Sequence, residues 1–272
     1  LFQSDLRPGR EHVGAPTCSR LRTTEFAHGR PPAEISASCP PHGLSRQHAG
    51  APMLRFRALP KEPSRWRRLE LILFATVLVI FNWQLVRGVL PENLTFLPSA
   101  VAAGEWWRLF THPFIHVSWY HLLLDGAAFL LLYDMLEEMR SPIRALYVAS
   151  SAAGSLLASW WWDPMIEMNG LCGLSGIAHG LMAVTALEMM SSGATRREVR
   201  IAGLVSYSLV IGKSAVESLT GQALIGFLHF GLLGTPVAAC HAGGVLGGIV
   251  VYALVSLVRR YRTHQDTWVH SV

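Results

Sequence analysis

Two short motifs inside apolar segments carry side chains that can do chemistry. The sequence has Gly-Leu-Ser-Gly at 173–176 and His-Ala-Gly-Gly at 241–244. A serine hydroxyl becomes a nucleophile when a base such as imidazole removes its proton, which is the chemistry of acyl transfer. Ser175 and His241 are far apart in the sequence, so the elements that carry them must bring them together.

The composition predicts a membrane protein made of helices. Of the 272 residues, 51% are hydrophobic and only 15% are charged, whereas about a quarter of the residues of a soluble domain are charged. A membrane-spanning helix needs about 20 apolar residues. Segments of that kind occur near 69–89, 118–137, 142–162, 172–191, 198–219 and 236–258. We predict an all-α polytopic membrane protein with a six-helix bundle. A soluble helical bundle is the alternative, but these segments lack a polar face.

The N-terminal part of the chain differs from the rest. Residues 1–52 are rich in arginine, histidine, proline and serine, contain no lysine and show no apolar periodicity. We expect them to be disordered, and they have no apolar stretch typical of a signal peptide. Because Met53 comes just before the apolar pattern, we expect 1–52 to be a non-native extension; a genuine disordered tail is the alternative. The membrane domain is expected over 53–262, with a cytoplasmic tail over 263–272.

Arginine placement predicts the orientation in the membrane. Arginines cluster before the first segment, between the second and third, between the fourth and fifth, and after the sixth. They are Arg65, Arg67, Arg68, Arg140, Arg144, Arg196, Arg197, Arg200, Arg259, Arg260 and Arg262. Loops 163–171 and 220–235 have neither lysine nor arginine. By the positive-inside rule both termini are cytoplasmic and 90–117 is external. This accounts for the net charge of +5 without a nucleic-acid partner, and we expect a bacterial inner membrane.

The predicted topology places the candidate residues at one depth. The second, fourth and sixth segments enter from the external side. Ser175, His241, His121 and Asp125 then lie in first or second turns, within the outer third of the bilayer at about 1.5 Å per residue. Polar groups at that depth are costly and usually functional.

Small residues explain how two of these segments can meet. Glycines recur about once per turn, which lets helix backbones approach closely. They are Gly173, Gly176 and Gly180 in one segment and Gly243, Gly244, Gly247 and Gly248 in the other. We therefore expect the Ser175 hydroxyl within hydrogen-bond reach of His241. Ordinary small-residue packing without chemistry is the alternative.

The motifs together resemble the rhomboid family of intramembrane serine proteases over roughly 104–250. The resemblance is carried by Gly-Glu-Trp-Trp-Arg at 104–108, the series His112, His116 and His121, and the motifs at 173–176 and 241–244. It implies a catalytic Ser175–His241 dyad with no third acid. It also implies an oxyanion site near His121 and the Ser175 backbone N–H, and we name Asp125 and Gly173 as further supporting residues of that site. No metal or cofactor is implied.

A narrower resemblance is to the rhombosortase subgroup. It is carried by 173–180, Gly212-Lys213, Glu217, Gly221, Leu233-Gly234 and Val237. It implies cleavage of C-terminal hydrophobic sorting segments with a Gly-Gly motif on exported proteins, near the outer membrane face. A rhomboid-like pseudoprotease that binds transmembrane segments without cutting them is the alternative. A transporter is disfavoured because no internal repeat is evident. The oligomeric state stays open.

Asp125 departs from the pattern, because many rhomboids have asparagine there. An ionised carboxylate cannot donate a hydrogen bond to an oxyanion. Asp125 can be protonated by burial, or accept a bond from His121 four residues earlier and orient that ring, or mark a weakened site. We favour the second interpretation.

The remaining polar residues have structural interpretations beside functional ones. For His112 and His116 we favour structural or hydrogen-bonding roles over metal ligation. His179, one turn below Ser175, is expected to bond a neighbouring backbone or helix. Lys213 and Glu217, four residues apart, are expected to form a buried structural pair rather than a catalytic one. Cys172 and Cys240 form either a disulfide in an oxidising periplasm or two small buried thiols.

Overall fold

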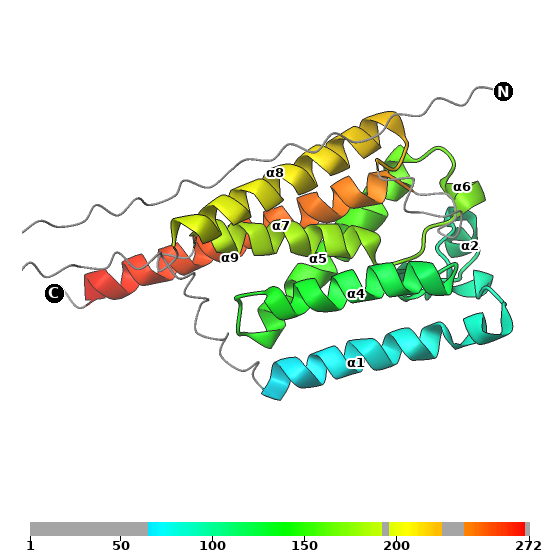
Figure 1. The fold of residues 1–272 in the computed structure, drawn as a ribbon, viewed down its shortest axis with the longest axis horizontal. Helices are drawn as coiled ribbons and strands as arrows, with labels where there is room; N and C mark the ends of the chain where they lie inside the picture. The colour runs from blue at the N-terminus through cyan, green and yellow to red at the C-terminus, as the bar shows by residue number, and fades with distance from the viewer. Residues whose placement is uncertain (1–64, 192–195, 225–236, 270–272) are drawn as a thin grey trace, which may run out of the picture. The chain divides into compact units, whose positions relative to one another are not determined.

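A computed structural model describes residues 65–191, 196–224 and 237–269, with side chains described to residue 263 (Figure 1). The long helices are α1 Arg65–Phe81, α4 Trp119–Met135, α5 Ser141–Trp162, α7 Ser175–Ser191, α8 Arg197–Thr220 and α9 Ala239–Val269. The short ones are η1 Trp83–Arg87, η2 Glu92–Leu94, α2 Pro98–Ala102, α3 Arg108–Thr111, η3 His112–Phe114 and α6 Ile166–Asn169. The predicted extension, Met53 and Leu233-Gly234 lie outside the described residues.

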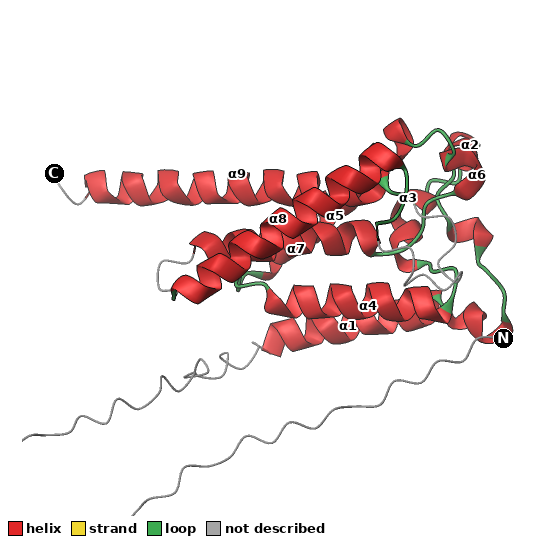
Figure 2. Cartoon of the chain, turned by 45° about the horizontal axis from the view of Figure 1, so that its top comes forward, coloured by secondary structure: helices red, strands yellow, loops and turns green. Residues whose placement is uncertain are grey.

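The all-helical prediction is confirmed for the part of the chain that the structure describes. Figure 2 shows helices and loops there, and the β pairing within it is one isolated bridge between Phe96 and Leu171. Each of the six predicted segments coincides with one long helix. Helix starts differ from the predicted ones by a few residues, because caps and loops, not hydropathy, set where a helix begins.

Fewer described helices are long and apolar enough to span a membrane than the sequence predicts. Three described helices qualify, over Arg65–Arg87, Arg197–Thr220 and Ala239–Thr263. A fourth qualifies if Arg108–Phe114 and Trp119–Met135, which meet at 94°, count together. The central helix α7 has only 17 residues, and several serines lower the hydropathy of α5. The six-span count therefore stays a prediction.

Backbone contact holds α5, α7 and α9 together. A Cβ atom on Gly244 of α9 would overlap the Gly176 carbonyl of α7, and one on Gly243 would overlap the Gly154 carbonyl of α5. Further along, Gly248 lies against Gly180 in the same way. Only glycine allows this approach, as small-residue packing of membrane helices requires. The predicted close packing of the fourth and sixth segments is confirmed.

The outer helices carry apolar side chains on their free faces. Leu209 of α8 is 61% exposed and Leu254 of α9 is 55% exposed, and α1 exposes Ile72 in the same way. A soluble protein rarely leaves so many large apolar side chains uncovered. Lipid is the environment in which these faces are stable.

A cluster of buried charges holds the turn between α4 and α5. Arg144 donates to the Met139 carbonyl at 2.7 Å and pairs with Glu70 of α1, whose carboxylate also accepts from Tyr133 at 2.7 Å. Arg67 donates to the Leu136 carbonyl at 2.6 Å, and Glu188 of α7 accepts from the Glu137 N–H at 2.6 Å. We call Arg67, Glu70, Tyr133, Arg144 and Glu188 the corner cluster. It joins α1, α4, α5 and α7 at one end of the bundle.

Candidate active site

The predicted nucleophile and base lie at the same end of neighbouring helices. Ser175 is the first residue of α7, and His241 is the third residue of α9. The first N–H groups of a helix have no partner within it, so the backbone beside Ser175 is suited to bind an anion. The contact between Gly176 and Gly244 lies one residue beyond Ser175 and keeps the two helix ends together.

The two side chains do not hydrogen-bond to each other among the described residues. The Ser175 hydroxyl lies 3.6 Å from the Cys240 thiol, and His241 Nδ1 lies 2.7 Å from Glu217 Oε2. The Cys240 thiol contacts the serine, and Cys240 is the residue just before His241 in α9. The predicted direct bond is therefore absent, because Glu217 attracts one side of the imidazole and Cys240 takes the serine hydroxyl. Catalytic hydrogen bonds are often long or misaligned until substrate binds.

Four residues from three helices form a second cluster beside Ser175, with Glu217 and His241 buried and the other two partly buried. Lys213 Nζ lies 2.7 Å from Glu217 Oε2 and 2.9 Å from His179 Nε2. The His179 and His241 rings stack with centroids 4.0 Å apart and planes 15° from parallel. We call His179, Lys213, Glu217 and His241 the histidine cluster. The predicted pairing of Lys213 with Glu217 is confirmed.

His179 also has the backbone contact expected of it. Its Nδ1 lies 2.7 Å from the Ser175 carbonyl oxygen, one turn earlier in α7. The link between Glu217 and His241 was missed by sequence reasoning. The signal was available, since Glu217 lies in the last turn of α8 and so at the predicted depth of His241.

His121 and Asp125 approach the backbone just before Ser175. His121 Nε2 lies 3.1 Å from Asp125 Oδ2, but the ring N–H is not aligned well enough for a hydrogen bond, so the bond expected from His121 to Asp125 is not formed. The Val117 N–H points to His121 Nδ1 at a long 3.5 Å. That contact favours the tautomer with hydrogen on Nε2, which leaves a donor near the start of α7.

Gly173 is required where it stands. Its φ of 96° is in the left-handed region. A Cβ there would lie 2.9 Å from both His121 Nε2 and Asp125 Oδ2. Its N–H donates to the His112 carbonyl at 3.1 Å, which ties the segment before α4 to the start of α7. The structure thus brings His121, Asp125 and Gly173 together, as the sequence predicts.

The other candidates have structural positions. His112 Nδ1 lies 3.0 Å from the Arg108 carbonyl, which agrees with the hydrogen-bonding role expected of it. His116 is fully buried, and its ring nitrogens have no hydrogen-bond partner among the described residues. Cys172 and Cys240 are free thiols, so the disulfide alternative is not formed.

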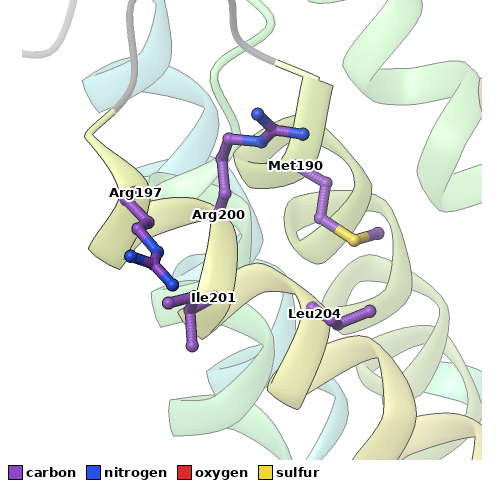
Figure 3. Close-up of a pocket in the computed structure, with 5 residues that line it drawn as sticks. All are labelled: Met190, Arg197, Arg200, Ile201 and Leu204. Carbon is purple, nitrogen blue, oxygen red and sulfur yellow. The ribbon is translucent and has the colours of Figure 1, made fainter.

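A pocket lies far from these residues along α7. It is lined by Met190, Arg197, Arg200, Ile201 and Leu204 (Figure 3). Met190 is 15 residues beyond Ser175 in the same helix, which is roughly 22 Å. None of the predicted site residues lines this pocket, so it is separate from the candidate active site.

Comparison with known proteins identifies the family. Residues 103–258 match the model of the rhomboid domain. The match covers more than half of the chain, so the chain belongs to the rhomboid family. Family membership and the long apolar helices together make it an integral membrane protein.

Two Bacillus subtilis (strain 168) proteins are similar to the chain. "Putative rhomboid protease YdcA" is 34% identical over 95 residues, which cover 34% of this chain and 46% of that protein. "Rhomboid protease GluP" is 24% identical over 174 residues, which cover 62% of this chain and 34% of that protein. The chain spans less than half of the length of either relative.

Proposed function

We propose that the chain is an intramembrane serine endopeptidase with Ser175 as nucleophile and His241 as base. The observation that carries the proposal is the meeting of the two helix ends, where the Ser175 hydroxyl contacts Cys240, the residue next to His241. We expect side-chain rotation of Ser175 and His241 on substrate binding to bring the hydroxyl to the base. The names of both similar proteins, which describe rhomboid proteases, agree with this activity.

The proposed reaction is acyl transfer in two steps. His241 takes the proton of the Ser175 hydroxyl as the oxygen attacks a substrate peptide carbonyl. The Ser175 N–H and His121 Nε2–H stabilise the tetrahedral oxyanion. His241 returns the proton to the leaving amine, and water then hydrolyses the ester on Ser175. The reaction requires no metal or cofactor.

The proposed substrates are C-terminal hydrophobic sorting segments of the Gly-Gly type on exported proteins, as in rhombosortases. Lys213 and Glu217 belong to the sequence pattern behind this proposal, and Glu217 contacts both His241 and Lys213. Coexpression with a reporter ending in Gly-Gly, an apolar segment and a basic end tests it. A matched reporter with Leu-Leu in place of Gly-Gly is the control. Equal cutting of both reporters would contradict the sorting specificity.

The proposed location is a bacterial inner membrane, with both termini cytoplasmic and cleavage near the outer face. A topology reporter fused after Arg262 should report cytoplasm, and one inserted near residue 166 should report the external side. The arginine distribution supports this orientation. The reverse labelling would put Ser175 near the cytoplasmic face and exclude exported proteins as substrates.

A pseudoprotease that binds transmembrane segments is the second candidate. The absence of a Ser175–His241 hydrogen bond among the described residues favours it. A fluorophosphonate probe separates the two functions, because it reacts only with an activated serine. Labelling that disappears in Ser175→Ala supports the protease. An unlabelled wild-type protein that still captures a transmembrane segment supports the pseudoprotease.

A further inference from the structure

Glu217 contacts more of the candidate site than a structural ion pair requires. It comes from α8, and its side chain is only 1% exposed. One carboxylate oxygen meets both the Lys213 ammonium and His241 Nδ1, each at 2.7 Å. The other oxygen accepts from the Leu224 N–H at 2.9 Å. The carboxylate is thus held from two further directions while it faces the histidine.

The hydrogen-bond partners in the histidine cluster show which ring nitrogen of His179 and of His241 carries a hydrogen. Lysine can only donate, so His179 Nε2 must accept from Lys213. His179 Nδ1 then carries the hydrogen and donates to the Ser175 carbonyl. Glu217 Oε2 can only accept, so His241 Nδ1 carries a hydrogen as well. In the neutral imidazole, His241 Nε2 is then left with the lone pair that a base needs.

The same histidine and carboxylate atoms could instead bind a metal ion. Ligand atoms of His179, Glu217 and His241 lie within 4.8 Å of one another. The Lys213 ammonium already contacts two of these three groups at hydrogen-bond distance. A second cation there would meet a positive charge at close range without enough carboxylate to balance it. Lysine therefore takes the place that a metal would occupy.

We propose that Glu217 is a positioning residue that holds His241 in the tautomer with a free Nε2, while Lys213 fixes the carboxylate. The inference rests on the proposed protease function. It replaces the two-residue dyad implied by the family resemblance with a Ser175–His241–Glu217 set. The carboxylate stabilises the imidazolium that forms when His241 takes the serine proton, as the acid of a triad does.

The competing explanation is that Glu217 only neutralises Lys213. The variants Glu217→Gln and Lys213→Met/Glu217→Gln distinguish the two roles. The single change leaves the lysine charge without its partner, which destabilises the fold. The double change removes both charges and keeps a side chain of similar length beside His241. Glu188→Gln is the matched control, because it alters another buried glutamate outside the site.

The readout is labelling of the full chain by a fluorophosphonate probe in detergent micelles. Ser175 Oγ attacks phosphorus, the P–F bond breaks, fluoride leaves and the serine proton goes to His241 Nε2. The maximal labelling rate and the probe concentration at half-maximal rate are measured separately, with thermal unfolding alongside. We expect both Glu217 variants to lose about 10²- to 10⁴-fold in maximal rate with little change in half-saturation. The double variant and Glu188→Gln should stay folded.

Each outcome decides the inference. Low rates in a folded double variant, with Glu188→Gln at the wild-type rate, support a positioning role. A double variant that recovers the wild-type rate overturns it and leaves charge neutralisation. Labelling of wild type that EDTA abolishes overturns it in favour of a metal. Wild-type protein that is never labelled at Ser175 refutes the protease itself, whereas equal labelling of wild type and Glu217→Gln refutes only the role of Glu217.

Discussion

The corner cluster and the histidine cluster both bury charges inside the bundle, but they use them differently. In the corner cluster, Arg67 and Arg144 donate to backbone carbonyls of the turn between α4 and α5. In the histidine cluster, the Glu217 carboxylate contacts two side chains, the Lys213 ammonium and His241 Nδ1. The other ring nitrogen of His241, Nε2, does not contact Glu217.

The difference separates architecture from chemistry. Charged side chains that donate to backbone carbonyls fix a turn, because buried carbonyls need hydrogen-bond partners. A charged side chain that contacts an imidazole beside a serine decides which ring nitrogen carries the hydrogen. Burial of an ionisable residue therefore does not by itself identify a functional site, and the kind of partner does.

The largest effect is expected at the proposed catalytic pair. Ser175→Ala and His241→Ala should each abolish cleavage and probe labelling, and the double variant should be no worse than either one, because the residues act as a unit. Initial rates on the sorting-tail reporter measure this. Appreciable turnover by Ser175→Ala would show that Ser175 is not the nucleophile, and the histidine cluster would then have no catalytic serine to serve.

The next effect concerns the oxyanion side. Asp125→Leu and His121→Ala should each lose about 10²-fold in turnover, the scale of one lost oxyanion donor, and the double variant should lose little more. Asp125→Asn should keep substantial activity, because an amide can accept from the ring or donate to the oxyanion itself. Full activity in Asp125→Leu would exclude Asp125 from the site.

The corner cluster should respond in stability rather than in rate. Arg144→Met leaves Glu70 without its cationic partner and the Met139 carbonyl without its donor, and breaking such a pair costs about 3 kcal/mol. Thermal unfolding in detergent measures the loss, and labelling per folded molecule should stay at the wild-type value. A fall in that rate with unchanged stability would show that the corner acts on the chemistry.

The smallest effect is expected at Cys240. Cys240→Ala removes the thiol that holds the Ser175 hydroxyl and changes little volume, so the labelling rate should equal or exceed that of wild type. Probe kinetics on folded protein measure it. A loss of about 10²-fold, the size of a lost catalytic contact, would make the thiol part of the mechanism.

Much of this arrangement is predictable from the sequence because it depends on local patterns. Hydropathy finds the long helices of the described residues, glycine spacing predicts the meeting of α7 with α9, and the four-residue spacing predicts the Lys213–Glu217 pair. The contact from Glu217 to His241 was not predicted, because it joins two helices and depends on how each is rotated. The Ser175–Cys240 contact was not predicted for the same reason. Hydropathy gives the depth of a residue in the membrane but not the direction in which its side chain points around the helix axis.

The backbone contacts among α5, α7 and α9 bear on how the protein responds to its lipid environment. Helices that pack through long side chains can slide or tilt when the bilayer thickens or thins. Gly176 and Gly244 leave no side chain to yield between α7 and α9. A change in acyl-chain length would then be absorbed by α1, while the helix ends that carry serine and histidine stay together. The glycines thus insulate the reaction geometry from hydrophobic mismatch.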